Sequence, residues 1–337
     1  ATTSTSNAGV ANLFSGNDGS TITLTESANG SYTLIGGSGV DHLTGGREND
    51  TLSGASNSDF FYIVGGVDKV TDLSSGDSLI VSSEATANAT GISEFIATTS
   101  TSNAGVANLF SGNDGSTITL TESANGAYSL IGGLGVDLLT GGNGHDSIFG
   151  ASGHDQLDGG VGNDILNGGS GNDTFIIGAG IDTVDDLVTG DNLIVRSGAT
   201  VNAPNIAHFV ATTDSSNAGI ANLTAGDSGS IITLTNSGVG SYNLVGGAGV
   251  DVLNAAEGSD TLFGQDGDDF LDGGLGNDIL TSGSHFDTFN VSSGTDRVTD
   301  LATGDILIVS YGATANATDI SLFTATNATS NRGTANV

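Results

Sequence analysis

The chain has 337 residues, of which 36% are hydrophobic and 55 are glycine, with a single proline and no cysteine. It carries 38 acidic residues against 5 basic ones, which gives a formal net charge of −33 at pH 7. This charge argues against nucleic acid or an anionic membrane surface as a partner. The absence of cysteine excludes disulfides and thiolate metal sites, and no apolar run is long enough for a transmembrane segment.

Three similar units follow one another along the chain. The stretch ATTSTSNAGVANLFSGNDGSTITLTESANG occupies residues 1–30, recurs unchanged at 97–126, and recurs with substitutions at 211–240. Repetition on this scale predicts an architecture of stacked repeats. The predicted domains are 1–96, 97–210 and 211–324, followed by 325–337 as the start of a fourth unit or a tail.

Each unit opens with a segment typical of β-structure. In the first unit, TITLTES alternates polar residues with the apolar Ile22 and Leu24, and the pair Asn29-Gly30 is a strong signal for a tight hairpin. We therefore expect a small hairpin or sandwich-like element here. Amphipathic helices are not indicated, and the best candidate, 88–96, is short.

The second part of each unit is an array of nonapeptides. The arrays cover 36–62, with three nonapeptides, and 132–176 and 246–290, with five each. The eighth position is always apolar, as at Leu166 and Phe175, and we expect it to face the interior of a short strand. The sixth position is always aspartate: Asp41, Asp50, Asp59, Asp137, Asp146, Asp155, Asp164, Asp173, Asp251, Asp260, Asp269, Asp278 and Asp287.

The third part of each unit is a flank that follows the array. It occurs at 66–82, 180–196 and 294–310, and it contains three or four further aspartates and an apolar run such as Leu-Ile-Val. This run predicts a buried strand, which we expect to close the end of the array.

The arrays have the chemistry of a site for a hard cation. Calcium takes six to eight oxygen ligands, which carboxylates and backbone carbonyls supply, and glycine lets the chain turn sharply enough to aim its carbonyls inward. Two nonapeptides make one coil, so an ion is expected between each turn and the turn two nonapeptides later. This spacing predicts about seven calcium ions. The predicted ligands are the sixth-position aspartates together with the glycines Gly132, Gly141, Gly159, Gly168 and Gly273.

Some positions predict additional or weaker sites. Flank aspartates such as Asp182, Asp186 and Asp191 are candidates for further ligands. The weaker sites are expected where the glycines are replaced, at Glu48, Asn57, Ala255, Ala256, His285 and Phe286.

The nonapeptide G-G-x-G-x-D-x-U-x resembles the calcium-binding repeat of RTX (repeats-in-toxin) proteins. The resemblance implies an all-β fold: tandem parallel β-roll modules, joined by small β-hairpin or sandwich-like elements, in an elongated array. It also implies a secreted, extracellular protein at a bacterial cell surface, exported by type I secretion. Proteins similar to this depend on calcium for their folded structure.

No catalytic motif accompanies the repeats. The histidines His42, His145, His154, His208 and His285 have no zinc-site spacing, and the paired carboxylates are most simply ion ligands. We therefore expect a non-enzymatic, calcium-dependent structural component of a surface assembly, such as a surface layer or filament, that associates with itself. The alternatives are the stalk of an RTX adhesin, or the β-roll appendage of a secreted RTX protease, lipase or epimerase.

Overall fold

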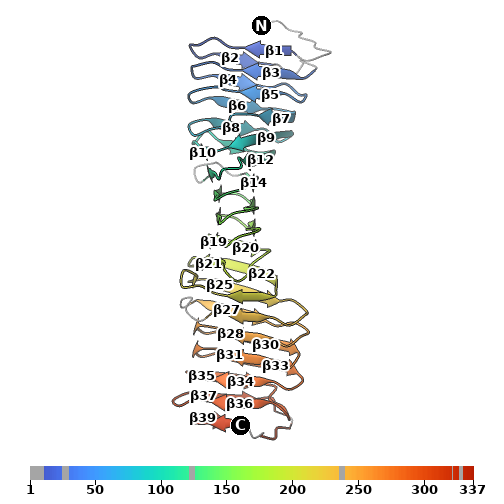
Figure 1. Ribbon diagram of the computed structural model, residues 1–337, viewed down its shortest axis with the longest axis vertical. Coiled ribbons are helices and arrows are strands. Elements are labelled where there is room, and N and C mark those ends of the chain that lie inside the picture. Colours follow the sequence, from blue (N-terminus) through green and yellow to red (C-terminus); the bar gives the residue numbers. More distant parts are fainter. Residues whose placement is uncertain (1–10, 25–29, 121–125, 235–239, 321, 326–328) are drawn as a thin grey trace. The chain divides into compact units, whose positions relative to one another are not determined.

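The protein is all-β, as the sequence predicts. The computed structural model describes residues 11–24, 30–120, 126–234, 240–320, 322–325 and 329–337, and every regular element within these ranges is a strand (Figure 1). The described residues therefore contain no helix, and the candidate helix at 88–96 is instead part of strands β9 (Ala85–Ile92) and β10 (Glu94–Ile96).

Contacts divide the chain into two compact units, Ala1–Asp173 and Thr174–Val337. Each unit is a parallel β-solenoid in which coils stack one on the next, from blue to green in unit 1 and from yellow to red in unit 2 of Figure 1. The division falls inside the second array. The boundaries drawn from sequence repetition remain a prediction.

Unit 1 has a long sheet on one side and two shorter sheets on the other. The long sheet contains β1 (Ala11–Phe14), β3 (Tyr32–Ile35), β5 (Thr51–Ser53), β7 (Gly66–Val70), β9 (Ala85–Ile92), β12 (Val106–Ser111), β14 (Tyr128–Ile131), β16 (Ser147–Phe149) and β18 (Ile165–Asn167). The first short sheet contains β2 (Thr21–Thr23), β4 (His42–Thr44), β6 (Phe60–Ile63), β8 (Ser78–Val81) and β11 (Ser102–Asn103). The second contains β10 (Glu94–Ile96), β13 (Thr117–Thr119), β15 (Leu138–Gly142) and β17 (Gln156–Gly160).

Unit 2 repeats this arrangement. One side contains β20 (Ile181–Val184), β22 (Thr200–Ile206), β25 (Ile220–Ala225), β27 (Ser241–Val245), β30 (Thr261–Asp266), β33 (Ile279–Ser284), β35 (Thr295–Thr299), β37 (Thr314–Thr318) and β39 (Thr334–Asn336). The other side contains β19 (Thr174–Ile177), β21 (Asn192–Val195) and β24 (Ser216–Asn217), then β23 (His208–Val210), β26 (Ile231–Thr233), β28 (Val252–Asn254), β31 (Phe270–Asp272), β34 (Thr288–Val291), β36 (Ile306–Val309) and β38 (Ser330–Asn331). A small pair, β29 (Glu257–Gly258) and β32 (Leu275–Gly276), lies at a turn.

The expected hairpins are not present among the described strands. Strand β2 pairs with β4 and β1 pairs with β3, both in parallel, so the opening segment of the first unit forms additional coils of the solenoid. The turn residues 25–29 lie outside the described residues. A hairpin preference in a short segment is overridden here because the strands find partners in neighbouring coils.

The flanks also continue the solenoid. Strand β8 carries the first of their apolar runs, which is buried as predicted, but it pairs with β6 on one side and β11 on the other. The expectation that this strand closes the array was therefore wrong. The coil length changes instead: Leu34 pairs with Leu52, a step of two nonapeptides, whereas Thr86 pairs with Val106, which is a longer step along the chain.

The interior is narrow and filled by the eighth residue of each nonapeptide. Strands such as β4 and β5 bury only their central residue, because alternate side chains of a strand point to opposite faces. The apolar residues at this position are all fully buried, as predicted: Leu43, Leu52, Phe61, Leu139, Ile148, Leu157, Leu166, Phe175, Leu253, Leu262, Leu271, Leu280 and Phe289.

Candidate metal centre

The thirteen sixth-position aspartates all lie inside the solenoid, immediately before a strand. Each is at most 2% exposed, although ionised carboxylates are almost never fully buried without a partner. Because each coil of an array contains two nonapeptides, the aspartates of alternate nonapeptides stand above one another at each edge. We call each of these rows an aspartate ladder.

One carboxylate oxygen of most ladder residues ties two coils together, whereas that of Asp137 accepts the hydroxyl of Ser116 and that of Asp251 the N–H of Ser230. The Oδ1 atom accepts the backbone N–H of the residue 18 positions earlier, for example from Asp137 to Asp155 at 2.8 Å and from Asp251 to Asp269 at 2.8 Å. The same bond forms at 2.8 to 3.1 Å in the pairs Asp41–Asp59, Asp50–Asp68, Asp59–Asp77, Asp146–Asp164, Asp155–Asp173, Asp260–Asp278, Asp269–Asp287, Asp278–Asp296 and Asp287–Asp305.

The ladders extend beyond the arrays into the flanks. Six flank aspartates are also at most 2% exposed: Asp68, Asp77, Asp182, Asp191, Asp296 and Asp305. Of these six, Asp182 and Asp191 were predicted from the sequence as ligand candidates, and the third candidate, Asp186, is only partly buried. The signal that identifies the others is the unbroken spacing of nine residues after Asp59 and Asp287, which continues although the glycines do not.

The second carboxylate oxygen is where a ligand is needed. The Oδ2 atoms of Asp68, Asp146, Asp155, Asp260, Asp269, Asp278 and Asp296 are buried with no hydrogen-bond partner. A buried oxygen of this kind is costly unless it is protonated or binds a cation. In chain order, they lie between the first and the last buried aspartate of each array with its flank.

The first and the last buried aspartates of each array with its flank, in chain order, are different because the protein satisfies their second oxygens. At the start of the arrays, Oδ2 of Asp41, Asp137 and Asp251 accepts the N–H of the glycine four residues earlier, at 2.8 to 3.0 Å. At the far end, Oδ2 of Asp77 and Asp305 accepts an N–H from three residues earlier, at 2.8 and 2.6 Å. The unsatisfied oxygens therefore occur between two self-satisfied ends.

The leading glycines leave space next to these oxygens. A Cβ atom on Gly141 would lie 2.5 Å from Oδ2 of Asp146 and would also meet the carbonyl oxygen of Gly159 in the next coil. A Cβ on Gly132 would lie 2.8 Å from Oδ2 of Asp137 and would meet the carbonyl of Gly150. The predicted glycines Gly159, Gly168 and Gly273 stand in the same way over Asp164, Asp173 and Asp278. Carboxylate and carbonyl oxygens thus converge at Gly132 and Gly141.

Burial weakens the acidity of the ladder. Desolvation, the largest cause, raises the pKa of Asp68, Asp260 and Asp296 to about 7 and that of Asp146 and Asp155 to about 6, against an ordinary value of 3.8. Neighbouring carboxylates contribute in the same direction for most of them. With coils about 4.8 Å apart, two ionised neighbours in a ladder repel by about 3 kcal/mol at an effective dielectric constant of about 20.

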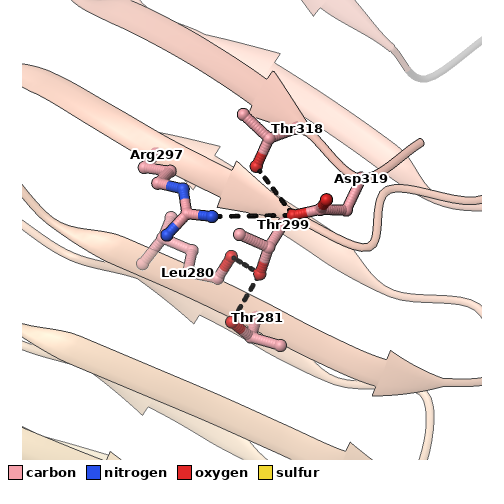
Figure 2. Close-up of polar contacts among 6 residues, drawn as sticks. All are labelled: Leu280, Thr281, Arg297, Thr299, Thr318 and Asp319. Atoms are coloured by element: carbon pink, nitrogen blue, oxygen red, sulfur yellow. Dashed lines mark hydrogen bonds and ion pairs between the residues drawn. The ribbon is translucent and has the colours of Figure 1, made fainter.

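Basic side chains adjacent to the ladders point away from them. Arg297 follows the buried Asp296 but faces outward, where its guanidinium lies 3.5 Å from the carboxylate of Asp319 (Figure 2). The same strand carries Thr299, whose hydroxyl lies 2.6 Å from that of Thr281 on the outer face. Lys69 follows Asp68 and is likewise exposed. Neutralisation of these two ladder residues therefore does not come from the adjacent cation.

The donor set fits calcium. Within the described ranges, no three His, Cys, Asp or Glu side chains come close enough to hold a metal by themselves. A site in these turns must therefore take most of its ligands from backbone carbonyls, which suits a hard cation with six to eight oxygen ligands better than a transition metal. When bound, the ion would supply the positive charge that the buried oxygens lack.

A family model of the RTX calcium-binding nonapeptide repeat matches the chain in four copies, at residues 33–69, 129–157, 149–184 and 245–280. The chain carries RTX calcium-binding repeats. The matches extend past the arrays to include Asp68 and Asp182, in agreement with the extended ladders. No curated protein matches the chain.

RTX repeat proteins are typically secreted. None of the described elements of this chain is a helix that could cross a membrane. The turns in which glycines are replaced still belong to the ladders. Asp260, which follows Ala255-Ala256, donates its N–H to Asp278, and Asp287, which follows Phe286, accepts the N–H of Asp269. Whether these turns bind calcium more weakly stays a prediction.

Proposed function

We propose that this chain is a non-enzymatic, calcium-dependent structural component of a secreted bacterial surface assembly. The observation that carries the proposal is the set of buried Oδ2 atoms without hydrogen-bond partners, which recur along the ladders beside the leading glycines. About seven ions between consecutive turns would neutralise these carboxylates and join coil to coil.

Calcium concentration then controls folding. For extracellular modules with dissociation constants near 10⁻⁴ to 10⁻³ M, millimolar calcium stabilises by about 0.4 to 1.4 kcal/mol per site, or about 3 to 10 kcal/mol over seven sites. At micromolar calcium the same contribution is close to zero. The chain would thus remain unfolded before export and fold outside the cell.

Self-association is supported by the outer face of the long sheets. In unit 1, Ile131 lies beside Phe149 in the paired strands β14 and β16, and Phe149 is 46% exposed. In unit 2, Val245 lies beside Phe263, which is 41% exposed. Aligned apolar side chains on an exposed sheet favour lateral contact with a second copy, which would bury them.

Imaging and sedimentation of the full chain with and without calcium test this proposal. Ordered sheets or filaments that form with calcium and dissolve with chelator are expected. Replacing Phe149 and Phe263 with serine should reduce assembly while leaving calcium-induced folding intact. A calcium-folded protein that stays monomeric at high concentration would refute assembly and favour the stalk of an adhesin instead.

A further inference from the structure

A second set of inter-coil bonds lies next to the aspartate ladders. It uses the side chain of the fifth residue of the nonapeptide, a position that the RTX repeat pattern leaves variable. Asn49, His145, His154, Asp268 and Asn277 each accept the backbone N–H of the residue 18 positions later, at 2.8 to 3.0 Å. We call these fifth-position bonds.

Fifth-position bonds run in the opposite direction to those of the ladder. The N–H of Phe286 donates to Asp268 in the coil before, at 3.0 Å, while the next N–H, that of Asp287, donates to Asp305 in the coil after, at 3.1 Å. Two consecutive amides of one turn are therefore held from opposite sides, which fixes the peptide planes of the turn.

The held amide determines where a carbonyl points. The N–H of the fifth residue and the C=O of the fourth belong to one planar trans peptide and point in opposite directions. When the N–H points to the preceding coil, the carbonyl points to the following one. The fourth-position carbonyl of Gly153 faces the next coil, because a Cβ on Gly171 would meet it, although the preceding fifth residue, Val136, offers the N–H of His154 no acceptor. A fifth-position bond therefore holds an orientation that a turn without the bond also adopts.

We propose that the fifth residue is a positioning residue for calcium. By accepting the N–H one coil later, asparagine, histidine or aspartate holds the peptide of that later turn so that its fourth-position carbonyl stays directed into the space between coils where an ion binds. This inference rests on the proposed calcium function. Valine has no acceptor, and it occupies this position in the first nonapeptide of every array, at Val40, Val136 and Val250.

Two substitutions in the full chain test the proposal in opposite directions. Asn277→Ala removes the acceptor of the Thr295 N–H, whereas Asn277→Asp keeps an acceptor. The control is Ser259→Ala, which changes another fifth residue, one whose side chain is one bond shorter than that of asparagine. Val250→Asn adds an acceptor at a side chain that is 62% exposed, and Val250→Leu is its control. The readout is hydrogen exchange by mass spectrometry across a calcium titration, followed in the peptides that contain Thr295 or Asp268.

Asn277→Ala is expected to raise the calcium concentration at which the Thr295 peptide is half-protected by about two- to tenfold, and Asn277→Asp should stay close to the parent. Val250→Asn should lower the calcium concentration at which the Asp268 peptide is half-protected. The proposal is overturned if Asn277→Ala behaves like Ser259→Ala and Val250→Asn like Val250→Leu while the parent remains calcium-dependent. If Asn277→Ala does not fold, Val250→Asn decides alone. A parent chain protected equally without calcium would instead overturn the proposed function.

Discussion

Gly141 offers a direct test of the space beside a ladder oxygen. Its φ lies outside the left-handed region, so alanine accepts the backbone, but the added Cβ would lie 2.5 Å from Oδ2 of Asp146 and meet the carbonyl of Gly159. Relieving such a contact costs about 1 to 3 kcal/mol. Losing one calcium site at millimolar calcium costs about 0.4 to 1.4 kcal/mol more. Gly141→Ala should therefore destabilise the protein by about 1.5 to 4.5 kcal/mol.

The assay is urea unfolding of the full chain at millimolar calcium, followed by far-UV circular dichroism. The matched control is Gly16→Ala, because Gly16 also lacks a left-handed φ and a Cβ there has nothing within 4 Å. We expect a lower midpoint for Gly141→Ala and little change for Gly16→Ala. Equal midpoints for the two variants would refute the reasoning that the leading glycine keeps space for carboxylate, carbonyl and ion.

Three further predictions follow from burial and charge. Asp278→Asn should lower the number of calcium ions bound, measured by calorimetry, by about one, because its Oδ2 atom is buried without a hydrogen-bond partner. The control Asp214→Ala changes an exposed residue and should leave this number unchanged. An equal loss in both variants would contradict the ladder as the binding site. The folded-state pKa of Asp68 and Asp296 is raised to about 7, so the calcium-free protein should be most stable below about pH 4 and lose that stability as pH rises through 7. With calcium bound, stability should instead rise with pH, since protons compete with calcium for the carboxylates. Plots of the urea midpoint against pH, measured with and without calcium, should therefore cross. Parallel plots would exclude this competition. Phe175→Ala should cost about 3 to 5 kcal/mol, because the ring is fully buried in the narrow interior, and an unchanged urea midpoint would count against that packing.

Regular spacing made much of this structure predictable. An interval of nine residues, with aspartate at position six and an apolar residue at position eight, is enough to place Asp155 in a buried row and Leu157 in the core. The glycine spacing likewise locates the turns, and Gly132 and Gly141 do stand next to carboxylate oxygens. These features depend on periodicity alone, which is visible in the sequence.

The coils between the arrays were not predictable in the same way, because their length varies and local signals mislead. The Asn29-Gly30 pair indicated a hairpin, yet the flanking strands pair with other coils. In these regions asparagine side chains connect the coils: Asn103 donates to the carbonyl of Ala127 and accepts from the N–H of Gly105. Asn217 makes the equivalent bonds, and only the recurring Ser-Asn-Ala-Gly sequence hinted at a shared role.

The fifth-position bonds were also hidden in the sequence. Histidine, asparagine and aspartate look unrelated at a variable position, and His145 and His154 had no metal-site spacing. Their common property is an acceptor atom at a suitable distance from Cβ, which becomes informative only when the register of the coils is known.

Calcium dependence of folding is tested most directly by far-UV circular dichroism of the full chain near neutral pH, first in chelator and then across a calcium titration. A buried row of carboxylates without counter-ions predicts little β-signal in chelator, a cooperative rise as calcium reaches the millimolar range, and loss of the signal when chelator is restored. A β-spectrum of the same intensity in chelator and in calcium would contradict calcium as the ion that completes these turns.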